Sequence, residues 1–247
     1  MTAAFTVVIP ARFGATRLPG KPLADIGGKP LIRHVWEPAS ASAAKHVCIA
    51  TDDDRIRDAA RAFGAEVVMT SSHHASGTDR IAEVAQMLDM PDDAIVINVQ
   101  GDEFGLSAAL IDQVAQALHA HPEREMATLG ARFLDRPEWL DPHIVKVIVD
   151  AHQDAIYFSR APIPWRGEGG GNAPILSLRH MGLYAYRAGF LRTFTTLKPT
   201  ELELSERLEQ LRALHYGFKI RVEEACAPAC VGVDTPEDLE RVRRMAG

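Results

Sequence analysis

The chain has 247 residues, of which 47% are hydrophobic and 24% charged, proportions typical of a globular protein and sufficient for one α/β domain. Its formal net charge of -6 argues against a broad nucleic-acid-binding face, because phosphate backbones need concentrated Lys and Arg. No apolar run approaches the ~20 residues of a membrane span and no secretory signal precedes the first strand-like run, so we expect a cytoplasmic protein that binds neither nucleic acid nor membrane.

Short apolar or β-branched runs alternate with helical stretches through the first hundred residues. The pattern predicts helices over residues 29–42, 53–63 and 78–88, and strands over residues 5–9, 46–50, 66–69 and 94–99. This order indicates parallel strands joined by crossover helices, in a doubly wound sheet that is covered on both faces. The strand ends at Pro10, Thr51 and Gln100 are expected to open into a cleft.

The second half reads differently, because consecutive strands lack long crossovers. Strands are predicted over residues 126–133, 144–149, 155–159 and 180–186, and helices over residues 187–197, 204–216 and from about 236. The sheet is therefore expected to be mostly parallel but mixed. The glycine-rich residues 167–172 are expected to form a mobile loop and not a linker, so we predict a single domain over residues 1–247.

The segment that leaves the first predicted strand, residues 9–23, carries Arg12, Arg17 and Lys21 among glycines and prolines. Backbone N–H groups of such a turn can face phosphate oxygens, and the three cations can neutralise a leaving pyrophosphate. The spacing does not fit a Walker A loop, because Lys21 is followed by proline. The segment favours polyphosphate binding, with an exposed basic loop as the alternative.

The same segment resembles the signature loop of the 3-deoxy-manno-octulosonate (KDO) cytidylyltransferases, or CMP-KDO synthetases, and more loosely that of CMP-sialic acid synthetases and other sugar nucleotidyltransferases. The resemblance continues in the family's order through residues 50–52, 69–70, 76–80, 98–103, 157–160, 180–184, 208–212 and 232–238. It implies a fold like that of the nucleotide-diphospho-sugar transferases. It also implies transfer of CMP from CTP to KDO for lipopolysaccharide synthesis, by in-line attack of the sugar's C2 hydroxyl on the α-phosphate.

Two aspartates far apart in the sequence each follow an apolar step and a glycine. Asp102 follows Gly101, and Asp234 comes shortly after Gly232. Mg²⁺ prefers one or two carboxylates together with phosphate oxygens and water, so a pair from separate strand ends would suit it. The resemblance implies that both aspartates bind Mg²⁺, with Glu103 a weaker candidate. The structural alternatives are a turn residue for Asp102 and a helix cap for Asp234.

The resemblance assigns the remaining site residues to three groups. Catalytic roles fall to Arg12, Lys21, Asp102 and Asp234, and nucleotide binding to Ala11, Arg12, Arg17, Lys21, Ser76, Gly77, Thr78 and Arg80. Sugar binding falls to Gln100, Arg160, His180, Tyr184, Glu209 and Gln210, with Arg160 expected at the sugar carboxylate. No general base is identifiable. Residue by residue the structural alternatives are a helix cap for Ser76 or Thr78, a core histidine for His180 and a solvated helix face for Glu209.

The sequence departs from the family pattern after Glu103, where Phe104, Gly105 and Leu106 replace the usual proline and branched apolar residue. Losing proline is expected to loosen this segment beside the proposed metal site. A related acidic sugar, such as 8-amino-KDO or a sialic acid, is therefore one alternative acceptor, and a catalytically impaired nucleotide-binding homologue is another reading. The resemblance further implies a homodimer, with residues about 133–200 as a sugar-binding and dimerisation subregion.

Overall fold

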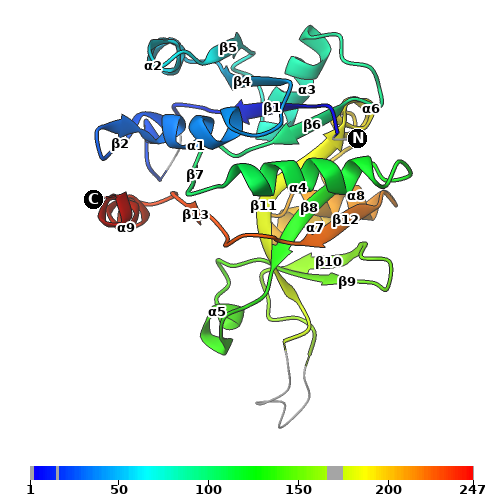
Figure 1. The fold of residues 1–247 in the computed structure, drawn as a ribbon. Coiled ribbons are helices and arrows are strands. Elements are labelled where there is room, and N and C mark those ends of the chain that lie inside the picture. The colour runs from blue at the N-terminus through cyan, green and yellow to red at the C-terminus, as the bar shows by residue number, and fades with distance from the viewer. Residues whose placement is uncertain (1–2, 15–16, 166–174, 247) are drawn as a thin grey trace.

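A computed structural model describes residues 3–14, 17–165 and 175–246 (Figure 1). Its main sheet has nine strands, seven of which follow the order β10-β9-β11-β6-β1-β4-β5, while β8 pairs with both β11 and β12. The strands of the main sheet are β1 (Phe5–Pro10), β4 (His46–Thr51), β5 (Glu66–Met69), β6 (Ile95–Asn98), β8 (Met126–Ala131), β9 (Lys146–Val149), β10 (Ala155–Ser159), β11 (Leu178–Arg187) and β12 (Ile220–Glu224).

Two short two-stranded ribbons stand beside the main sheet. One pairs β2 (Asp25–Ile26) with β3 (Lys29–Pro30), and the other pairs β7 (Glu103–Phe104) with β13 (Val231–Gly232). The helices are η1 (Lys21–Leu23), α1 (Leu31–Ser40), α2 (Asp54–Ala62), α3 (Gly77–Met87), α4 (Ala108–His119), α5 (Arg136–Leu140), α6 (Ala188–Phe194), α7 (Glu201–Glu206), α8 (Gln210–His215) and α9 (Pro236–Ala246). Within the described ranges no helix is both long and apolar enough to cross a lipid bilayer.

The predicted doubly wound, mixed sheet is confirmed. Strand β1 pairs in parallel with β4 and β6, and β4 pairs in parallel with β5. The direction changes at β11, which is antiparallel to β6, β8 and β9. Neighbouring residues of a strand point to opposite faces of the sheet, and helices cover both faces. Val7 and Ile9 pack in a cluster with α1 and α4, while Val8 packs with α3 and α6, and all three side chains are fully buried.

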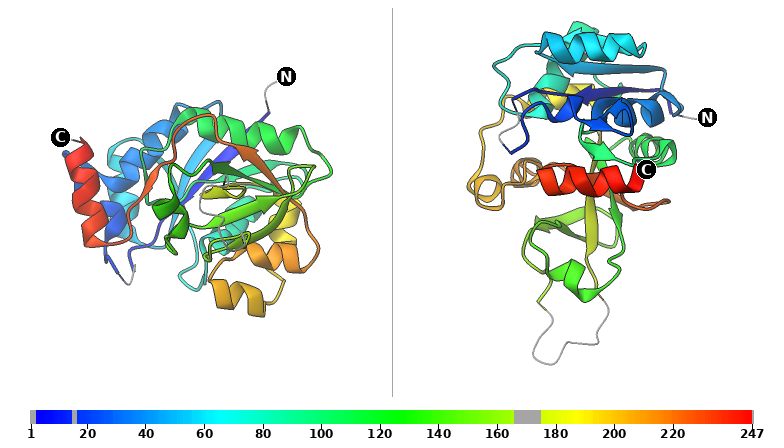
Figure 2. Two further views of the ribbon diagram at one scale, coloured as in Figure 1. Left: turned by 90° about the horizontal axis from the view of Figure 1, so that it is seen from below. Right: turned by 90° about the vertical axis from the view of Figure 1, so that its left-hand side faces the viewer.

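Helix α9 lies far from the preceding strands of the main sheet and packs beside β2 and α1 (Figures 1 and 2). Its Leu239 and Val242 are buried against Ile26 and Leu31. Arg243 donates from Nε to the carbonyl oxygen of Asp25 at 2.9 Å. Burying apolar side chains of this size stabilises the docked helix by roughly 1.5–3 kcal/mol each. This docking fixes the position of Asp234, two residues before the helix begins.

The single helix predicted over residues 204–216 is wrong, because two short helices with a corner between them occupy this region. Arg207 takes a left-handed backbone conformation, with φ of 55°, and ends α7. A buried ion pair across the corner, from Arg212 to Glu203 at 2.5 Å, holds α8 against α7. The corner brings Glu209 and Gln210 to the start of α8. Helices α4 and α5, strand β12 and the short ribbons were not predicted, and the predicted loop over residues 167–172 lies outside the described residues.

Candidate active site

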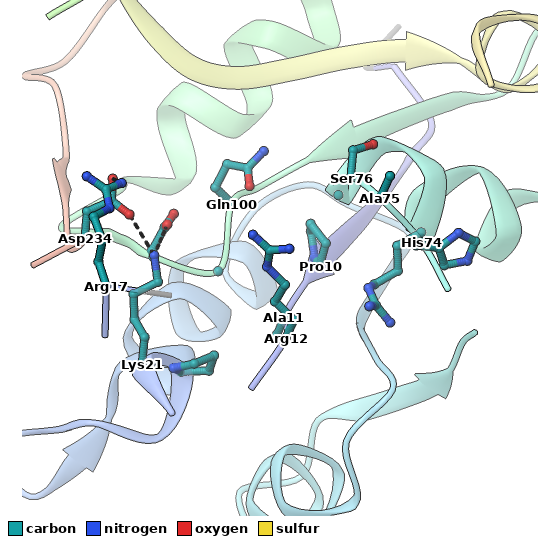
Figure 3. A pocket seen from close by; sticks show the side chains of 15 residues that line it. Pro10, Ala11, Arg12, Arg17, Lys21, His74, Ala75, Ser76, Gln100 and Asp234 are labelled. Carbon is teal, nitrogen blue, oxygen red and sulfur yellow. Dashed lines mark hydrogen bonds and ion pairs between the residues drawn. The ribbon is translucent and has the colours of Figure 1, made fainter. Parts of the chain in front are cut away.

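A cavity of about 290 Å³ lies at the carboxyl ends of β1 and β6 (Figure 3). Seven of the eight predicted nucleotide-binding residues line it: Ala11, Arg12, Arg17, Lys21, Ser76, Gly77 and Arg80. Of the three predicted cleft positions, Pro10 and Gln100 line this cavity. Thr51 does not, because its side chain is buried and its Oγ1 accepts a hydrogen bond from the backbone N–H of Asp53 at 3.2 Å.

Asp102 and Asp234 converge on one cation in this cavity. Lys21 Nζ donates to Asp102 Oδ2 at 2.5 Å and to Asp234 Oδ1 at 3.0 Å, and Arg17 pairs with Asp234 Oδ2 at 3.0 Å. Burial alone would lower the pKa of Lys21, but the two carboxylates raise it above its ordinary value, so the amine stays charged. Burial alone would raise the pKa of Asp234, whereas Lys21 and Arg17 together lower it. The two carboxylates therefore lie close enough together to contact the same ammonium group.

The ribbon of β7 and β13 causes this convergence. Glu103 pairs with Gly232, and the backbone N–H of Val233 donates to the carbonyl oxygen of Asp102 at 3.0 Å. The chain reaches the ribbon through Gly101, where an added Cβ would lie 2.8 Å from the carbonyl oxygen of Pro10. Only glycine allows the backbone to pass so close to the end of β1. The aspartates thus flank paired strands, although they are widely separated in sequence.

Glu103, the weaker metal-ligand candidate, forms a hydrogen bond with a cysteine. Its Oε2 accepts a hydrogen bond from Cys230 Sγ at 2.8 Å. Burial, reinforced by the negative charge of Asp102, raises the pKa of Glu103 to about 7. The contact ties the second residue of the Asp102 turn to the segment that leads to Asp234.

The departure at residues 104–106 adds contacts of its own. Phe104 pairs with Val231 in the ribbon, and its ring centroid lies 5.1 Å from that of His34. Gly105 has φ of 81°, a conformation that glycine adopts at no steric cost, and Leu106 is buried in the core. These contacts hold a segment that we expected to be loose.

A second cavity, of about 350 Å³, adjoins the first at Gln100, which lines both. Five of the six predicted sugar-binding residues line it: Gln100, His180, Tyr184, Glu209 and Gln210. Burial lowers the pKa of His180 to about 3, so its imidazole is neutral. His180 Nε2 lies 3.2 Å from Thr128 Oγ1, and its ring stands edge-on to Phe158, so the ring is both a core residue and part of the cavity wall.

Buried polar atoms face this second cavity without partners. Among the described residues six buried side-chain atoms have no hydrogen-bond partner, and four of these six concern this cavity: Asn98 Oδ1, Tyr184 OH, Glu209 Oε1 and Gln210 Nε2. All four residues line the second cavity. Each unpaired buried polar group costs about 1–3 kcal/mol, so a ligand rich in hydroxyl groups would recover that free energy. These unpaired atoms make the cavity suited to a polar ligand.

Arg160 does not line either of the two cavities described here. Its Nε donates to the carbonyl oxygen of Glu206 at 2.9 Å and its Nη1 to that of Pro142 at 3.2 Å. The guanidinium is therefore engaged in tying the end of β10 to α7. This placement does not support the predicted contact with a sugar carboxylate.

Ser76 serves both the fold and the cavity. Its Oγ accepts from the backbone N–H of Asp79 at 3.1 Å, and Asp79 Oδ2 accepts from that of Ser76 at 3.1 Å, which makes a capping box at the start of α3. Arg80 pairs with Asp52 at 3.0 Å and donates to Thr70. Thr78 is the exception among the predicted nucleotide residues, because it lines the second cavity.

Several residues that line the cavities had no predicted role. His74 lines the first cavity, and Asn98, His143 and Arg179 line the second. Asn98 carried a usable signal, since it is the one polar residue of a buried apolar strand. Arg179 forms an ion pair with Glu138 at 2.6 Å, a contact between distant segments that no local pattern announces.

The metal site expected from the sequence consists of two carboxylates. Among the described residues no cluster of three or more His, Cys, Asp or Glu side chains is arranged to hold a metal ion by itself. Two carboxylates are nevertheless the share that a protein commonly gives Mg²⁺ when phosphate oxygens and water complete its shell. The pair at Lys21 fits that pattern.

Comparisons with known proteins agree over nearly the whole chain. The cytidylyltransferase family model matches residues 6–220. A 3-deoxy-manno-octulosonate cytidylyltransferase of Pseudomonas syringae pv. syringae (strain B728a) is 55% identical, with 99% of each chain covered. A solved structure of CMP:2-keto-3-deoxy-manno-octonic acid synthetase complexed with CTP has a TM-score of 0.90 and 42% identity, with 98% of each chain covered. A putative glucose-1-phosphate thymidylyltransferase from Bacillus anthracis shares the fold at a TM-score of 0.68 and 16% identity, covering 98% of this chain and 95% of that one.

Proposed function

The chain belongs to the 3-deoxy-manno-octulosonate cytidylyltransferase family, and from this premise we propose that it transfers CMP from CTP to KDO and releases pyrophosphate. The product, CMP-KDO, is the activated sugar for lipopolysaccharide synthesis. One observation carries the proposal: two cavities of different chemistry adjoin at Gln100. The first gathers cations and two carboxylates, and the second presents buried polar atoms without partners.

We assign CTP to the first cavity. Arg12, which has no ion-pair partner among the described residues, extends into the cavity toward Gln100 (Figure 3), where it can meet phosphate oxygens. Lys21 and Arg17 add two further cations from the same loop. A guanidinium binds phosphate with two parallel hydrogen bonds, and several cations together stabilise the charge that builds on leaving pyrophosphate. The walls at Ala11, Ser76 and Gly77 are left for the cytidine.

Asp102 and Asp234 are proposed to hold Mg²⁺. When bound there, the ion would neutralise and polarise the phosphate oxygens. The chain's own contribution is to keep the two carboxylates at one place through the ribbon of β7 and β13. Because Lys21 already compensates their charge, the pair is stable before any nucleotide arrives.

The acceptor sugar is assigned to the second cavity. Its hydroxyl groups would satisfy Tyr184, Glu209 and Gln210, and Gln100 would orient the C2 hydroxyl at the boundary with the first cavity. No covalent intermediate with the protein is needed, so catalysis consists of positioning and charge neutralisation. The convergence of Asp102 and Asp234 argues against the impaired homologue that we considered as an alternative.

A panel of acceptors tests the proposal. Purified protein with CTP and Mg²⁺ is expected to release pyrophosphate with KDO, and to release far less with 8-amino-KDO or a sialic acid. Omitting the sugar gives the background rate of CTP hydrolysis. Release with another sugar and none with KDO would refute the KDO assignment while leaving cytidylyl transfer intact.

We also propose that the protein is a homodimer that associates through residues about 133–200. Five large apolar side chains of this subregion are exposed: Leu134, Leu140, Ile156, Trp165 and Leu176. The segments α5, β9 and β10 that carry or flank them project from one end of the molecule (Figures 1 and 2). Exposed apolar side chains gathered in one region are typical of protein interfaces.

Ile156→Asp is expected to weaken this dimer at least about 100-fold, because each copy loses roughly 1.5–3 kcal/mol of apolar burial and gains a charge at the interface. Light scattering coupled to size-exclusion chromatography over a dilution series measures the change. Leu204→Asp is the matched control, since Leu204 is similarly exposed on α7, outside the subregion. A wild type that stays monomeric, or equal effects of both variants, would contradict the proposal.

A further inference from the structure

Thr78 stands at the junction of the two cavities. It is the second residue of α3, whose first residue Gly77 and cap Ser76 line the first cavity. The side chain of Thr78 turns the other way, is only 2% exposed, and lines the second cavity. One helical turn therefore contributes to both cavities.

The hydroxyl of Thr78 is bound to the acceptor side of the site. Its Oγ1 donates to Glu209 Oε2 at 2.8 Å, across 131 residues of sequence. The other oxygen, Glu209 Oε1, is buried and has no hydrogen-bond partner in the described part of the chain. With Oε2 held, Oε1 is left to accept a hydrogen bond from a molecule in the cavity.

Arg212, whose guanidinium lies near Glu209, does not form a hydrogen bond with this carboxylate. Arg212 Nη2 lies 4.0 Å from Glu209 Oε1, beyond hydrogen-bond distance. Arg212 instead donates from Nε and Nη2 to the two oxygens of Glu203, at 2.8 and 2.5 Å. Burial raises the pKa of Glu209, and hydrogen bonding to Thr78 and, less strongly, to Ser76 opposes that rise, so losing the Thr78 hydroxyl would also weaken the carboxylate as an acceptor.

We propose that Thr78 is a positioning residue for the acceptor sugar and not a nucleotide contact: its hydroxyl fixes Glu209 so that Oε1 meets a hydroxyl group of the sugar. This inference rests on the assignment of the second cavity to the acceptor. It also means that α3 begins with residues for both substrates, Ser76 and Gly77 for CTP and Thr78 for the sugar.

The test compares Thr78→Val with Thr78→Ser. Valine keeps the branched shape and removes the hydroxyl, whereas serine keeps the hydroxyl. Thr78→Val is expected to raise the KM for the sugar about tenfold, the effect of one hydrogen bond to a charged group, and to leave the dissociation constant of CTP unchanged. Thr78→Ser is expected to remain within about twofold of wild type in both measurements, because the serine hydroxyl can donate the same hydrogen bond to Glu209.

A double-mutant cycle separates positioning from general damage. In a Glu209→Gln background, Thr78→Val should raise the KM for the sugar further by no more than about twofold, because the carboxylate that it positions is gone. Steady-state pyrophosphate release at saturating CTP gives the sugar KM, and calorimetry with Mg²⁺ gives the CTP affinity. Thermal unfolding checks that each variant is folded.

Three results would overturn the inference. Weaker CTP binding in Thr78→Val with an unchanged sugar KM would make Thr78 a nucleotide residue. Equal defects in the valine and serine variants would make its methyl group the important part, and no change in either would remove any role. The sugar used is whichever member of the acceptor panel the wild type turns over, so failure with KDO counts against the proposed function alone.

Discussion

Asp102→Asn is expected to lower kcat at least about 100-fold while the protein stays folded. Asparagine keeps the shape of the side chain but removes the charge that both Lys21 and a metal ion require. Polarisation of a phosphate by a bound cation is worth several kcal/mol, and about 3 kcal/mol corresponds to roughly 100-fold in rate. Pyrophosphate release measured over a range of Mg²⁺ concentrations checks this, and the variant should need more Mg²⁺ for half-maximal rate.

Asp25→Asn provides the matched control for this substitution. Asp25 is an exposed aspartate of β2, and within the described part of the chain its side chain accepts just one long hydrogen bond, from the backbone N–H of Gly28 at 3.4 Å. It should retain wild-type turnover and the same Mg²⁺ requirement. If Asp102→Asn also turned over CTP at nearly the wild-type rate at every Mg²⁺ concentration, the assignment of Asp102 to the metal would be wrong.

Lys21→Met is expected to lower kcat/KM for CTP by about 100-fold or more. The lysine side chain is 13% exposed and is the group that touches both aspartates. Methionine fills a similar volume, but it leaves Asp102 and Asp234 facing each other with reduced compensation and removes a cation from the phosphate site. Steady-state kinetics with CTP as the varied substrate measures the loss, and thermal unfolding reports whether the fold survives.

Arg17→Met is the control that shows how much of the loss in kcat/KM comes simply from removing a positive charge near Asp234. Arg17 also pairs with Asp234, but its side chain is 62% exposed, and ion pairs at such positions contribute only about 0–1 kcal/mol. Its substitution should therefore cost about tenfold or less. A Lys21→Met variant no worse than Arg17→Met would show that the buried bridge has no special part in catalysis.

The parallel half of the fold was predictable because its strands are continuous apolar runs separated by helices with clear polar faces. The predicted strand over residues 66–69 coincides with β5, and β1 and β4 are each only one residue longer than expected. Helix α4 was also within reach, since Ser107 precedes apolar residues at Leu110, Ile111, Val114 and Leu118 in helical spacing. The sequence therefore does contain a local signal for this helix.

Other features had no local signal. The corner at Arg207 depends on a left-handed arginine, a residue type that gives no hint of such a backbone, and on an ion pair between two helices. The ribbon of β7 and β13 has two residues in each strand, too few for any periodicity. Both are set by tertiary contacts and not by propensity.

In the candidate site, the lining residues were largely predictable from the sequence, but the directions of their side chains were not. Most of the residues that line the two cavities followed from the family resemblance, and Asp102 and Asp234 both contact Lys21 in the first cavity. Arg160 points toward backbone carbonyl groups and not into a cavity. Thr78 lines the second cavity, whereas Ser76 lines the first. Neighbours in sequence can point to different ligands because a helix rotates about 100° per residue.

Because Asp234 lies just before α9, the chain acquires its second aspartate only near the end of translation. A nascent polypeptide that has emerged only through β12 already contains all nine strands of the main sheet and the walls of the acceptor cavity. It has just one of the paired aspartates, because the other is delivered with the strand and helix that follow. An incomplete chain on the ribosome would thus lack the proposed metal site. Proteolytic cleavage before Asp234 would remove that site and the packing of α9 from a mature molecule, while all nine strands of the main sheet would remain.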